Sequence, residues 1–582
     1  MTGPAMAAGA LLAGPGRTRF RFWAPGCDPV LLEVEGQQPQ GMATLGDGWF
    51  GAEADCSAGA RYRFRLSDDL AVPDPASRAQ DGDVHGWSVV VDQSAYDWRN
   101  DQWHGRPWHE AVICEVHAGV MGGFAGVAKA LPDLAALGIT AIELMPIGAF
   151  SGKRNWGYDG VLPYAPAAAY GSPDDLKALV DSAHDLGLMI FLDVVYNHFG
   201  PDGNYLHACA PAFFDESRHT PWGGAIDFRQ EAVARFFIDN ALYWLNDYRF
   251  DGLRLDAVHA MADNDFLDRL AREVRGGVDP ARHVHLVLEN EANDAARLER
   301  GYDAQWNDDF HNVLHVLLTG ETQAYYRDFA DRPADRLARC LAEGFIYQGE
   351  GSPNHDGRPR GTASGHLPPV RFVTFLQNHD QIGNRALGER LTMMVDKARL
   401  RAAMGLLLLC PQIPLLFMGE ETGSRSPFLF FTDFHDELAD AVREGRRREF
   451  AAFPAFADPE ARKRIPDPNA METFTSSIPA PGPDAAEWRD FITTLLRLRA
   501  QHIVPGLAGA AATGASALSD AAVIAHWRLA NGARLTLAIN LGEQGVKIVN
   551  APTAGPLHVI GSEPRDDMLA PASCIAWLGH EG

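Results

Sequence analysis

Three carboxylic acids close separate apolar, strand-like runs near the middle of this 582-residue chain. Asp256 ends the run FDGLRLD, Glu289 ends HVHLVLE and Asp380 ends VRFVTFLQNHD. Acids at the carboxyl ends of buried parallel strands meet at one face of a β/α barrel, where the active sites of that fold lie. Converging carboxylates suit the cleavage of a glycosidic bond, in which one attacks or stabilises the sugar and another donates a proton. One such acid could merely cap a loop, but three with helical patterns between them predict an active site.

These acids require a scaffold that brings the ends of separate strands together. From about residue 111 the chain alternates short apolar runs with helical patterns, which is typical of parallel β/α units. One helix is predicted to begin at Ser172, with Asp175 completing a capping box, and to end at Gly187. Eight strands are expected, which indicates an α/β protein with a closed (β/α)8 TIM barrel and insertions in its βα loops. The runs predicted as strands are 112–117, 141–147, 188–195, 250–256, 284–289, 303–308, 371–377 and 413–418.

Both ends of the chain follow a different pattern from the middle. The first ~95 residues alternate apolar and polar side chains, as in TRFRFW and ARYRFRLSD, which indicates a β-sandwich. Near the other end, a helix is expected over 488–499, and Asn531-Gly532 between two alternating runs predicts a β-hairpin. The predicted domains are an immunoglobulin-like β-sandwich at 1–95, a catalytic barrel with loop insertions at 96–503, and a C-terminal β-sandwich domain at 504–582.

The net charge, the apolar runs and the spacing of the cysteines disfavour several classes of protein and of binding partner. The formal net charge is −25, which disfavours nonspecific binding to nucleic acid or to an anionic membrane. No basic stretch opens the chain and no apolar run has the length of a membrane span, so we expect a cytoplasmic protein. Three arginines at 446–448 are interpreted as a solvated helix face. The scattered cysteines support neither a disulfide framework nor a zinc site: Cys27, Cys56, Cys114, Cys209, Cys340, Cys410 and Cys574.

Four segments appear in a characteristic order: DVVYNH (193–198), GLRLDAVH (252–259), LVLENE (286–291) and FLQNHD (375–380). In order and spacing they resemble the four signature segments of the α-amylase superfamily of glycoside hydrolases. The resemblance implies that the acid of the second segment is a nucleophile and that the acid of the third is a general acid. It also implies that the acid of the fourth binds sugar hydroxyls and favours the distorted sugar. These catalytic positions are Asp256, Glu289 and Asp380.

Further residues are expected around the three acids. The side chain of Arg254 should share a barrel face with Asp256, because strand side chains alternate, and its charge would keep that acid ionised. The resemblance implies that His198 and His379 bind hydroxyls of the reacting sugar and that Tyr158 stacks on it. Asp193 is interpreted as a partner of Arg254, and Asn197 as a loop brace. Other candidates for substrate binding, several of which could instead be loop packing, are Trp156, Trp222, His259, Gln381, Glu291 and Asn293.

The subtype within the superfamily depends on other segments. GKRNWGYDGV (152–161), DAQWNDDFHNVLHVLLTGE (303–321), SPFLFFTDF (426–434) and IPDPNAMETF (465–474) look like those of maltooligosyltrehalose trehalohydrolases. The implied reaction hydrolyses the α-1,4 bond between a maltooligosaccharide and a terminal trehalose. Alternatives are a glucan branching or transferring enzyme, an α-1,6-debranching enzyme, and a carbohydrate-binding protein without catalysis. We expect no cofactor and no essential metal, an α-glucan oligosaccharide as substrate, and a monomer or weak homodimer.

Overall fold

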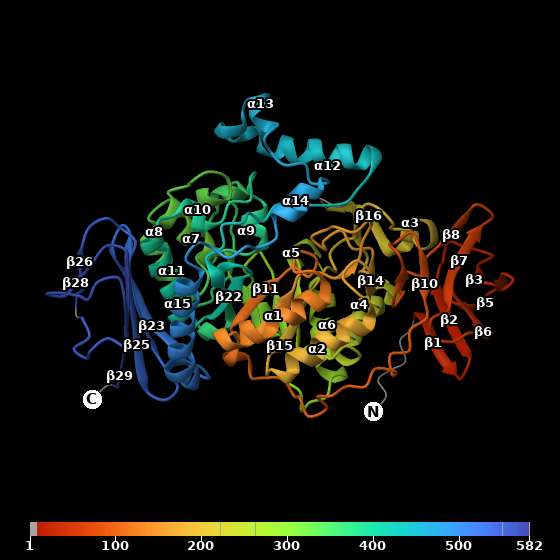
Figure 1. Cartoon of the computed structure of the whole chain (residues 1–582), viewed down its shortest axis with the longest axis horizontal. Coiled ribbons are helices and arrows are strands. Elements are labelled where there is room, and N and C mark those ends of the chain that lie inside the picture. The colour runs from red at the N-terminus through yellow and green to blue at the C-terminus, as the bar shows by residue number, and fades with distance from the viewer. Residues whose placement is uncertain (1–7, 221–222, 262, 550, 581–582) are drawn as a thin grey trace.

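The computed structural model describes residues 8–220, 223–261, 263–549 and 551–580. In Figure 1 a closed barrel forms the centre, with the N-terminal strands on one side and the C-terminal sheet on the other. A helical excursion lies above the barrel in the same view, with α12 (Asp436–Glu449), α13 (Pro459–Arg462) and α14 (Met471–Ser476). This architecture confirms the predicted fold class. No helix in the described ranges is long and apolar enough to cross a membrane.

Eight parallel strands form the barrel, and the last strand pairs with the first. Their residues are buried on both faces, as expected for a parallel sheet covered by helices. The strands follow one another around the barrel in chain order, so the eight strands predicted from the apolar runs are confirmed. They are β11 (Ile113–Val116), β12 (Ala141–Leu144), β15 (Met189–Val194), β18 (Gly252–Leu255), β19 (His285–Leu288), β20 (Ala304–Trp306), β21 (Phe372–Thr374) and β22 (Ile413–Phe417).

Helices cover the outside of the barrel and join its strands. In α2 (Pro173–Asp185) the Ser172 hydroxyl accepts a hydrogen bond from the Asp175 N–H at 3.1 Å, and the Asp175 carboxylate accepts one from the Ser172 N–H at 2.8 Å. This confirms the predicted capping box, and Gly187 follows the helix with a left-handed φ of +70°. The other helices of four or more residues in this region are α1 (Gly123–Leu137), α3 (Leu206–Cys209), α4 (Glu231–Asn246), α5 (Val258–Met261), α6 (Asn264–Gly277), α7 (Asp308–Thr319), α8 (Pro333–Glu343), α9 (His379–Gly383), α10 (Leu391–Met394), α11 (Lys397–Leu409) and α15 (Ala485–Leu498).

The strands outside the barrel form two groups, one at each end of the chain. Those of the N-terminal region lie in two sheets, with orders β1-β2-β6-β5 and β4-β3-β7-β10-β9, and β8 pairs with β7. Alternating burial along β2, where Phe20 and Phe22 are buried, matches the predicted sandwich. The strands are β1 (Gly9–Gly14), β2 (Arg17–Trp23), β3 (Leu31–Val34), β4 (Gln40–Gly41), β5 (Ala43–Gly46), β6 (Trp49–Ala54), β7 (Arg61–Ser67), β8 (Leu70–Val72), β9 (Gln80–Asp81) and β10 (Trp87–Val89).

The C-terminal region contains a five-stranded antiparallel sheet of order β23-β24-β25-β29-β27 and a small β26-β28 pair. The predicted hairpin is present, because β24 and β25 pair across a turn in which Gly532 has a φ of +82°. The strands are β23 (Ala511–Ser519), β24 (Ala522–Arg528), β25 (Ala533–Asn540), β26 (Val546–Lys547), β27 (His558–Ile560), β28 (Met568–Leu569) and β29 (Ser573–His580). Two further strand pairs lie in barrel loops: β13 (Gly148–Ala149) with β14 (Leu162–Pro166), and β16 (Phe214–Thr220) with β17 (Gly223–Ile226).

Candidate active site

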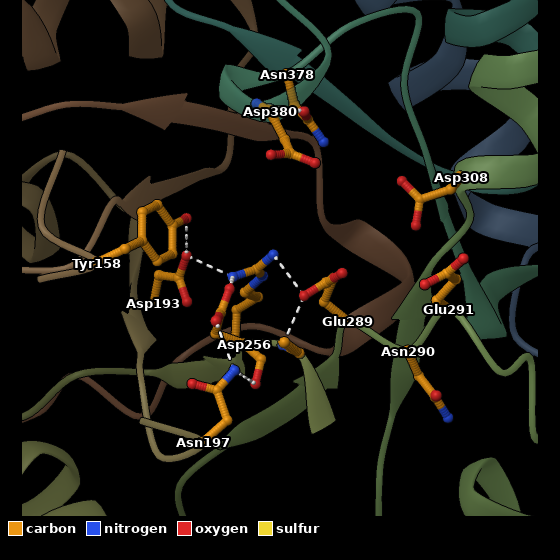
Figure 2. A network of polar contacts seen from close by, with 12 residues as sticks. Tyr158, Asp193, Asn197, Asp256, Glu289, Asn290, Glu291, Asp308, Asn378 and Asp380 are labelled. Atoms are coloured by element: carbon orange, nitrogen blue, oxygen red, sulfur yellow. Dashed lines mark hydrogen bonds and ion pairs between the residues drawn. The ribbon is translucent and has the colours of Figure 1, made fainter. Parts of the chain in front are cut away.

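The three predicted catalytic acids lie at the carboxyl end of the barrel. Asp256 is the first residue after β18, Glu289 is the first after β19, and Asp380 lies in α9, the short helix after β21. Figure 2 shows the three carboxylates pointing toward a common region. This arrangement follows from the closed barrel, since every parallel strand delivers its carboxyl end to the same rim. The fold therefore gathers acids that are separated by up to 124 positions in the chain.

A buried arginine links the acids to one another. Within the barrel, Arg254 Nη1 lies 2.7 Å from Asp193 Oδ2 and 2.7 Å from Asp256 Oδ1. Its Nη2 lies 3.4 Å from Glu289 Oε2, and the guanidinium stacks over the ring of Trp306 at 4.2 Å. Asp256 and Glu289 thus share one cation, which holds the two carboxylates close together. Burial disfavours charge on Arg254, but the surrounding acids, Asp193 foremost, raise its pKa.

Asp256 is held by two hydrogen-bond donors. Arg254 contacts one carboxylate oxygen, and Asn197 Nδ2 donates a hydrogen bond to the other at 2.9 Å. The same amide lies 3.2 Å from the Asp256 carbonyl oxygen. Asn197 therefore acts directly on the acid, in addition to bracing its loop. Two donors fix the direction of the carboxylate, as expected of a preorganised nucleophile.

Glu289 lies in an environment that favours its protonated form. Burial is the largest effect and raises the pKa of Glu289 well above its usual range; Arg254 opposes this shift, and the charge of Asp256 adds to it. The backbone N–H of Ala257 donates a hydrogen bond to Glu289 Oε2 at 2.6 Å. Ala257 has a left-handed φ of +42°, a conformation that costs energy for a residue with a Cβ. A strained backbone next to Asp256 thus orients the acid of the neighbouring strand.

Asp380 is fixed by its own short helix. Asn378 caps α9, because its side-chain oxygen accepts hydrogen bonds from the N–H groups of Asp380 and Gln381. Asn384, one turn further, donates its amide to Asp380 Oδ1 at 2.7 Å. The Asp380 carboxylate contacts solvent, but protein atoms surround much of it, and this desolvation raises its pKa. The hydrogen bonds of Asn378 and Asn384 therefore orient the Asp380 carboxylate toward Asp256 and Glu289.

Two histidines beside the acids have different surroundings. His379 Nδ1 donates a hydrogen bond to Glu115 of β11 at 2.5 Å. Burial alone would lower the pKa of His379, but the Glu115 carboxylate raises it. Desolvation lowers the pKa of His198, whose Nε2 lies 2.9 Å from the carbonyl oxygen of Tyr158. His379 is thus favoured as a cation at the rim, whereas His198 is a neutral side chain that positions the loop of Tyr158.

Tyr158 joins the two sides of the site. Its hydroxyl donates to Asp193 Oδ2 at 2.6 Å, the same oxygen that contacts Arg254. Its ring stacks on His379, with centroids 5.0 Å apart and planes inclined by 25°. Burial raises the pKa of Asp193 to about 6 against the opposing charge of Arg254. Asp193 thus accepts hydrogen bonds from both Arg254 and Tyr158, consistent with its predicted organising role.

Other predicted substrate-binding residues lie in differing positions. Trp156 is buried, stacks on Phe428 and lies edge-on to His379, which supports the packing alternative. Asn293 is also buried and donates to Asp309 Oδ2 at 3.0 Å. The substrate-binding roles of both residues stay predictions. Trp222 lies outside the described residues.

The remaining candidates stay at the rim. Glu291 is exposed, and its N–H donates to His259 Nδ1 at 3.3 Å. Gln381 Nε2 donates to Asp308 Oδ1 at 3.0 Å. The binding roles of these side chains stay predictions. Among the described residues, no group of three or more His, Cys, Asp or Glu side chains is arranged to hold a metal ion.

Sequence reasoning missed three acids of this region. Asp308 begins α7 two residues after the end of β20, and burial, followed by the charge of Asp380, raises its pKa to about 7. Glu115 and Glu143 are buried in β11 and β12, where they pair in register. Asp308 repeats the strand-then-acid pattern of the catalytic positions, which could have revealed it. Glu115 and Glu143 lie inside apolar runs, where only the barrel geometry shows their relation to the site.

Comparison with known proteins agrees with this geometry. A family model described as the catalytic domain of alpha amylase matches residues 76–220, and one for a domain of unknown function matches 510–575. A malto-oligosyltrehalose trehalohydrolase of Deinococcus radiodurans is 39% identical, over 98% of this chain and 95% of its own length. The chain belongs to the malto-oligosyltrehalose trehalohydrolase family. This membership confirms the resemblance seen in the signature segments.

Solved structures support the same fold. A crystal structure of a candidate alpha amylase from Salmonella typhimurium has a TM-score of 0.93 and 45% identity, covering 99% of this chain and all of that one. A pullulanase of Anoxybacillus sp. in complex with maltotetraose has a TM-score of 0.72 at 16% identity, covering 99% of this chain and 87% of its own. The second likeness concerns the fold alone. Together they place the trehalohydrolase chain in the architecture of the amylase-type enzymes.

Proposed function

We propose that this chain is a retaining glycoside hydrolase that cleaves the α-1,4 bond next to the terminal trehalose of maltooligosyltrehalose. One observation carries the proposal: Asp256 and Glu289 share the guanidinium of Arg254 at the barrel rim. A double displacement needs two carboxylates only about 5–5.5 Å apart, and a shared cation favours such closeness. Membership in the trehalohydrolase family supports the choice of substrate.

In the first step, a carboxylate oxygen of Asp256 attacks the anomeric carbon of the glucose next to the trehalose. A covalent glucosyl–enzyme bond forms while the bond from that carbon to O4 of the trehalose breaks. The proton of Glu289 passes to the departing O4, and trehalose leaves as a neutral molecule. Protonation of Glu289 before the reaction is supported by its burial, which raises its pKa.

In the second step, water attacks the same carbon and releases the enzyme. The ionised Glu289 takes a proton from this water, the bond to Asp256 breaks, and a maltooligosaccharide leaves. Asp380 and His379 are proposed to bind hydroxyls of the reacting glucose, where they favour its distorted, oxocarbenium-like state. Arg254 stabilises the charge that returns to Asp256 when the covalent bond breaks.

The choice among related activities is tested by substrate and product. The enzyme is incubated separately with maltooligosyltrehalose and with a maltooligosaccharide of equal length, and the products are separated by chromatography. We expect free trehalose from the first substrate, at a rate at least about tenfold above cleavage of the second. Formation of α-1,6-branched glucans would instead support a branching enzyme. Exclusive cleavage of α-1,6 bonds would support a debranching enzyme.

The stereochemistry of the reaction provides a second test. Two successive inversions leave the new reducing end of the maltooligosaccharide in the α configuration. Proton NMR spectra recorded in the first minutes should therefore show the α-anomer before mutarotation mixes the two forms. Initial β-anomer would exclude the covalent role of Asp256. A cytoplasmic location and a monomeric or weakly dimeric state stay predictions of the sequence.

A further inference from the structure

The helical excursion after β22 contributes one buried cation near the active site. Helix α12 lies above the barrel in Figure 1, and most of its side chains are exposed or half-buried. Arg446 is the exception, because only 8% of its side chain is exposed, compared with 27% for Arg447. The prediction that these arginines form a solvated face is therefore wrong for Arg446. Its burial calls for a structural reason.

Arg446 reaches from α12 to the turn that follows Asp380. Its Nη2 donates to the carbonyl oxygen of Gly383 at 2.5 Å and lies 3.2 Å from that of Arg385. These two carbonyls flank Asn384, whose side-chain amide donates to Asp380 Oδ1 at 2.7 Å. Hydrogen bonds from the guanidinium to the turn and from the Asn384 amide to the acid, joined by the backbone of the turn, thus connect the helix to the carboxylate.

The turn also packs against Trp156. A Cβ atom at Gly383 would lie 2.0 Å from the indole ring, so the turn backbone approaches this ring as closely as glycine allows. The same indole lies edge-on to Phe430 and to His379, with ring centroids 5.2 Å and 5.6 Å apart. Arg446 also lies over the ring of Phe430 at 5.5 Å. The turn is therefore contacted by both Trp156 and Arg446.

We propose that Arg446 is a positioning residue, which couples the α12 excursion to Asp380 through Asn384. The inference rests on the proposed function, in which Asp380 binds the reacting sugar. Without the guanidinium, the Gly383 carbonyl loses its donor from α12, the Arg385 carbonyl keeps only the N–H of Gly388, and the turn can relax away from Trp156. Asn384 would then no longer fix Asp380 in one orientation. Small errors in the placement of such a group cost large factors in rate.

The test compares variants of one helix. Arg446→Met retains the apolar stem beside Phe430 but removes every donor, and Arg447→Met is the control because Arg447 pairs with Glu444 of its own helix. With wild-type hydrolysis established first, we expect Arg446→Met to lower kcat about 10- to 100-fold, with KM changed less than about threefold. Arg447→Met should stay within about twofold of the wild type, and Arg446→Lys should recover part of the rate.

Coupling to Asn384 separates positioning from general stability. Asn384→Ala should lower kcat by a similar factor, and the double variant with Arg446→Met should be little worse than either single variant. Multiplication of the two losses would overturn the proposal, as would an Arg446→Met enzyme with wild-type kcat. If Arg446→Met fails to fold, Arg446→Lys takes its place in the same cycle.

A measurement that needs no turnover separates this inference from the proposed reaction. The amide N–H of Asn384 is bonded to the Asp380 carbonyl oxygen at 2.9 Å, and that of Arg385 to the Ile382 carbonyl oxygen at 3.1 Å. Hydrogen exchange at these two amides should be at least about tenfold faster in Arg446→Met than in Arg447→Met. Equal exchange in both variants would overturn the positioning role, whatever substrate the enzyme cleaves.

Discussion

At the scale of residues, a single arginine organises the acids of the site. Arg254 contacts Asp193, Asp256 and Glu289, and it is buried, so these interactions are poorly screened by water. The two proposed catalytic carboxylates nevertheless differ. Asp256 is fixed by two donors, Arg254 and Asn197, whereas burial raises the pKa of Glu289. These different surroundings support the proposed roles of nucleophile for Asp256 and acid for Glu289.

Replacement of Glu289 tests its role as proton donor. Glu289→Gln keeps the size of the side chain but removes the proton that the departing O4 requires. We expect kcat/KM to fall by about 10²–10⁴ or more, while oligosaccharide binding measured by calorimetry is retained. Glu299→Gln is the control, because Glu299 is an exposed acid that pairs with His366. Unchanged turnover of Glu289→Gln would refute the assigned role.

Asp308 offers a test through the pH profile. Its charge is among the causes that raise the pKa of Glu289, after burial and Asp256. Glu289 must be protonated to act, so activity is lost as the pH rises through its pKa. Asp308→Asn should therefore move the basic limb of the kcat/KM profile to lower pH, by about half a unit. Asp356→Asn, on an exposed loop, should leave the limb in place. A shift to higher pH would contradict this coupling.

At the scale of elements, the barrel strands bury acids beneath the site as well as at its rim. Glu115 of β11 lies in register with Glu143 of β12. Glu115 forms an ion pair with His379. Neither carboxylate oxygen of Glu143, by contrast, has a hydrogen-bond partner among the described residues. Burial, the largest effect, and the charge of Glu115 raise the pKa of Glu143 well above its usual value. These surroundings therefore favour the neutral form of Glu143 in the folded protein.

The pH dependence of stability should reveal this neutral acid. In the unfolded chain Glu143 ionises near pH 4.3, but in the folded chain it keeps its proton to higher pH, so stability falls as the pH rises. Glu143→Gln removes the titration. Its stability relative to the wild type should grow between pH 5 and pH 8, by at most about 1.4 kcal/mol per pH unit. Urea unfolding at both pH values measures the difference, and an equal difference at both would contradict the prediction.

At the scale of the whole molecule, the N-terminal sheets are joined to the barrel by a buried cation. Arg78 donates to the carbonyl oxygens of Ala76 and Ala8 and lies over the rings of Tyr164 and Tyr243. Tyr164 belongs to β14 and Tyr243 to α4, both within the barrel region. One side chain thus satisfies backbone groups on one side of the contact and packs on aromatic rings on the other.

Loss of the Arg78 guanidinium should destabilise the contact between the N-terminal sheets and the barrel without changing the rate of catalysis. Arg78→Leu keeps an apolar stem but removes the guanidinium that donates to the buried Ala76 carbonyl and to that of the half-buried Ala8. We expect a decrease in the free energy of unfolding of about 2–3 kcal/mol, measured with urea, and an unchanged kcat for the folded enzyme. Arg61→Leu, at an exposed ion pair with Glu35, should cost less than about 1 kcal/mol. Equal losses in both variants would argue against a special role for Arg78.

Much of the architecture was predictable because its signals are local. Each barrel strand is a short apolar run, and the start of α2 is set by Ser172 and Asp175 three residues apart. The same holds for the proposed catalytic acids, since Asp256 and Glu289 each follow directly after a strand. A closed barrel of parallel strands then forces such positions to one rim. The family resemblance added the expected roles, which local patterns alone do not provide.

The sequence by itself determined the order of the strands, the caps of the helices and the acids at the strand ends, because these depend on neighbouring residues. Only the tertiary structure decided the partners that act on those acids. Glu115 contacts His379 across 264 positions, and Arg446 holds a turn about 60 positions away. The same packing buries Trp156 and Asn293, which their sequence contexts did not predict. Burial and pKa depend on contacts between distant segments, and those contacts exist only once the barrel has closed.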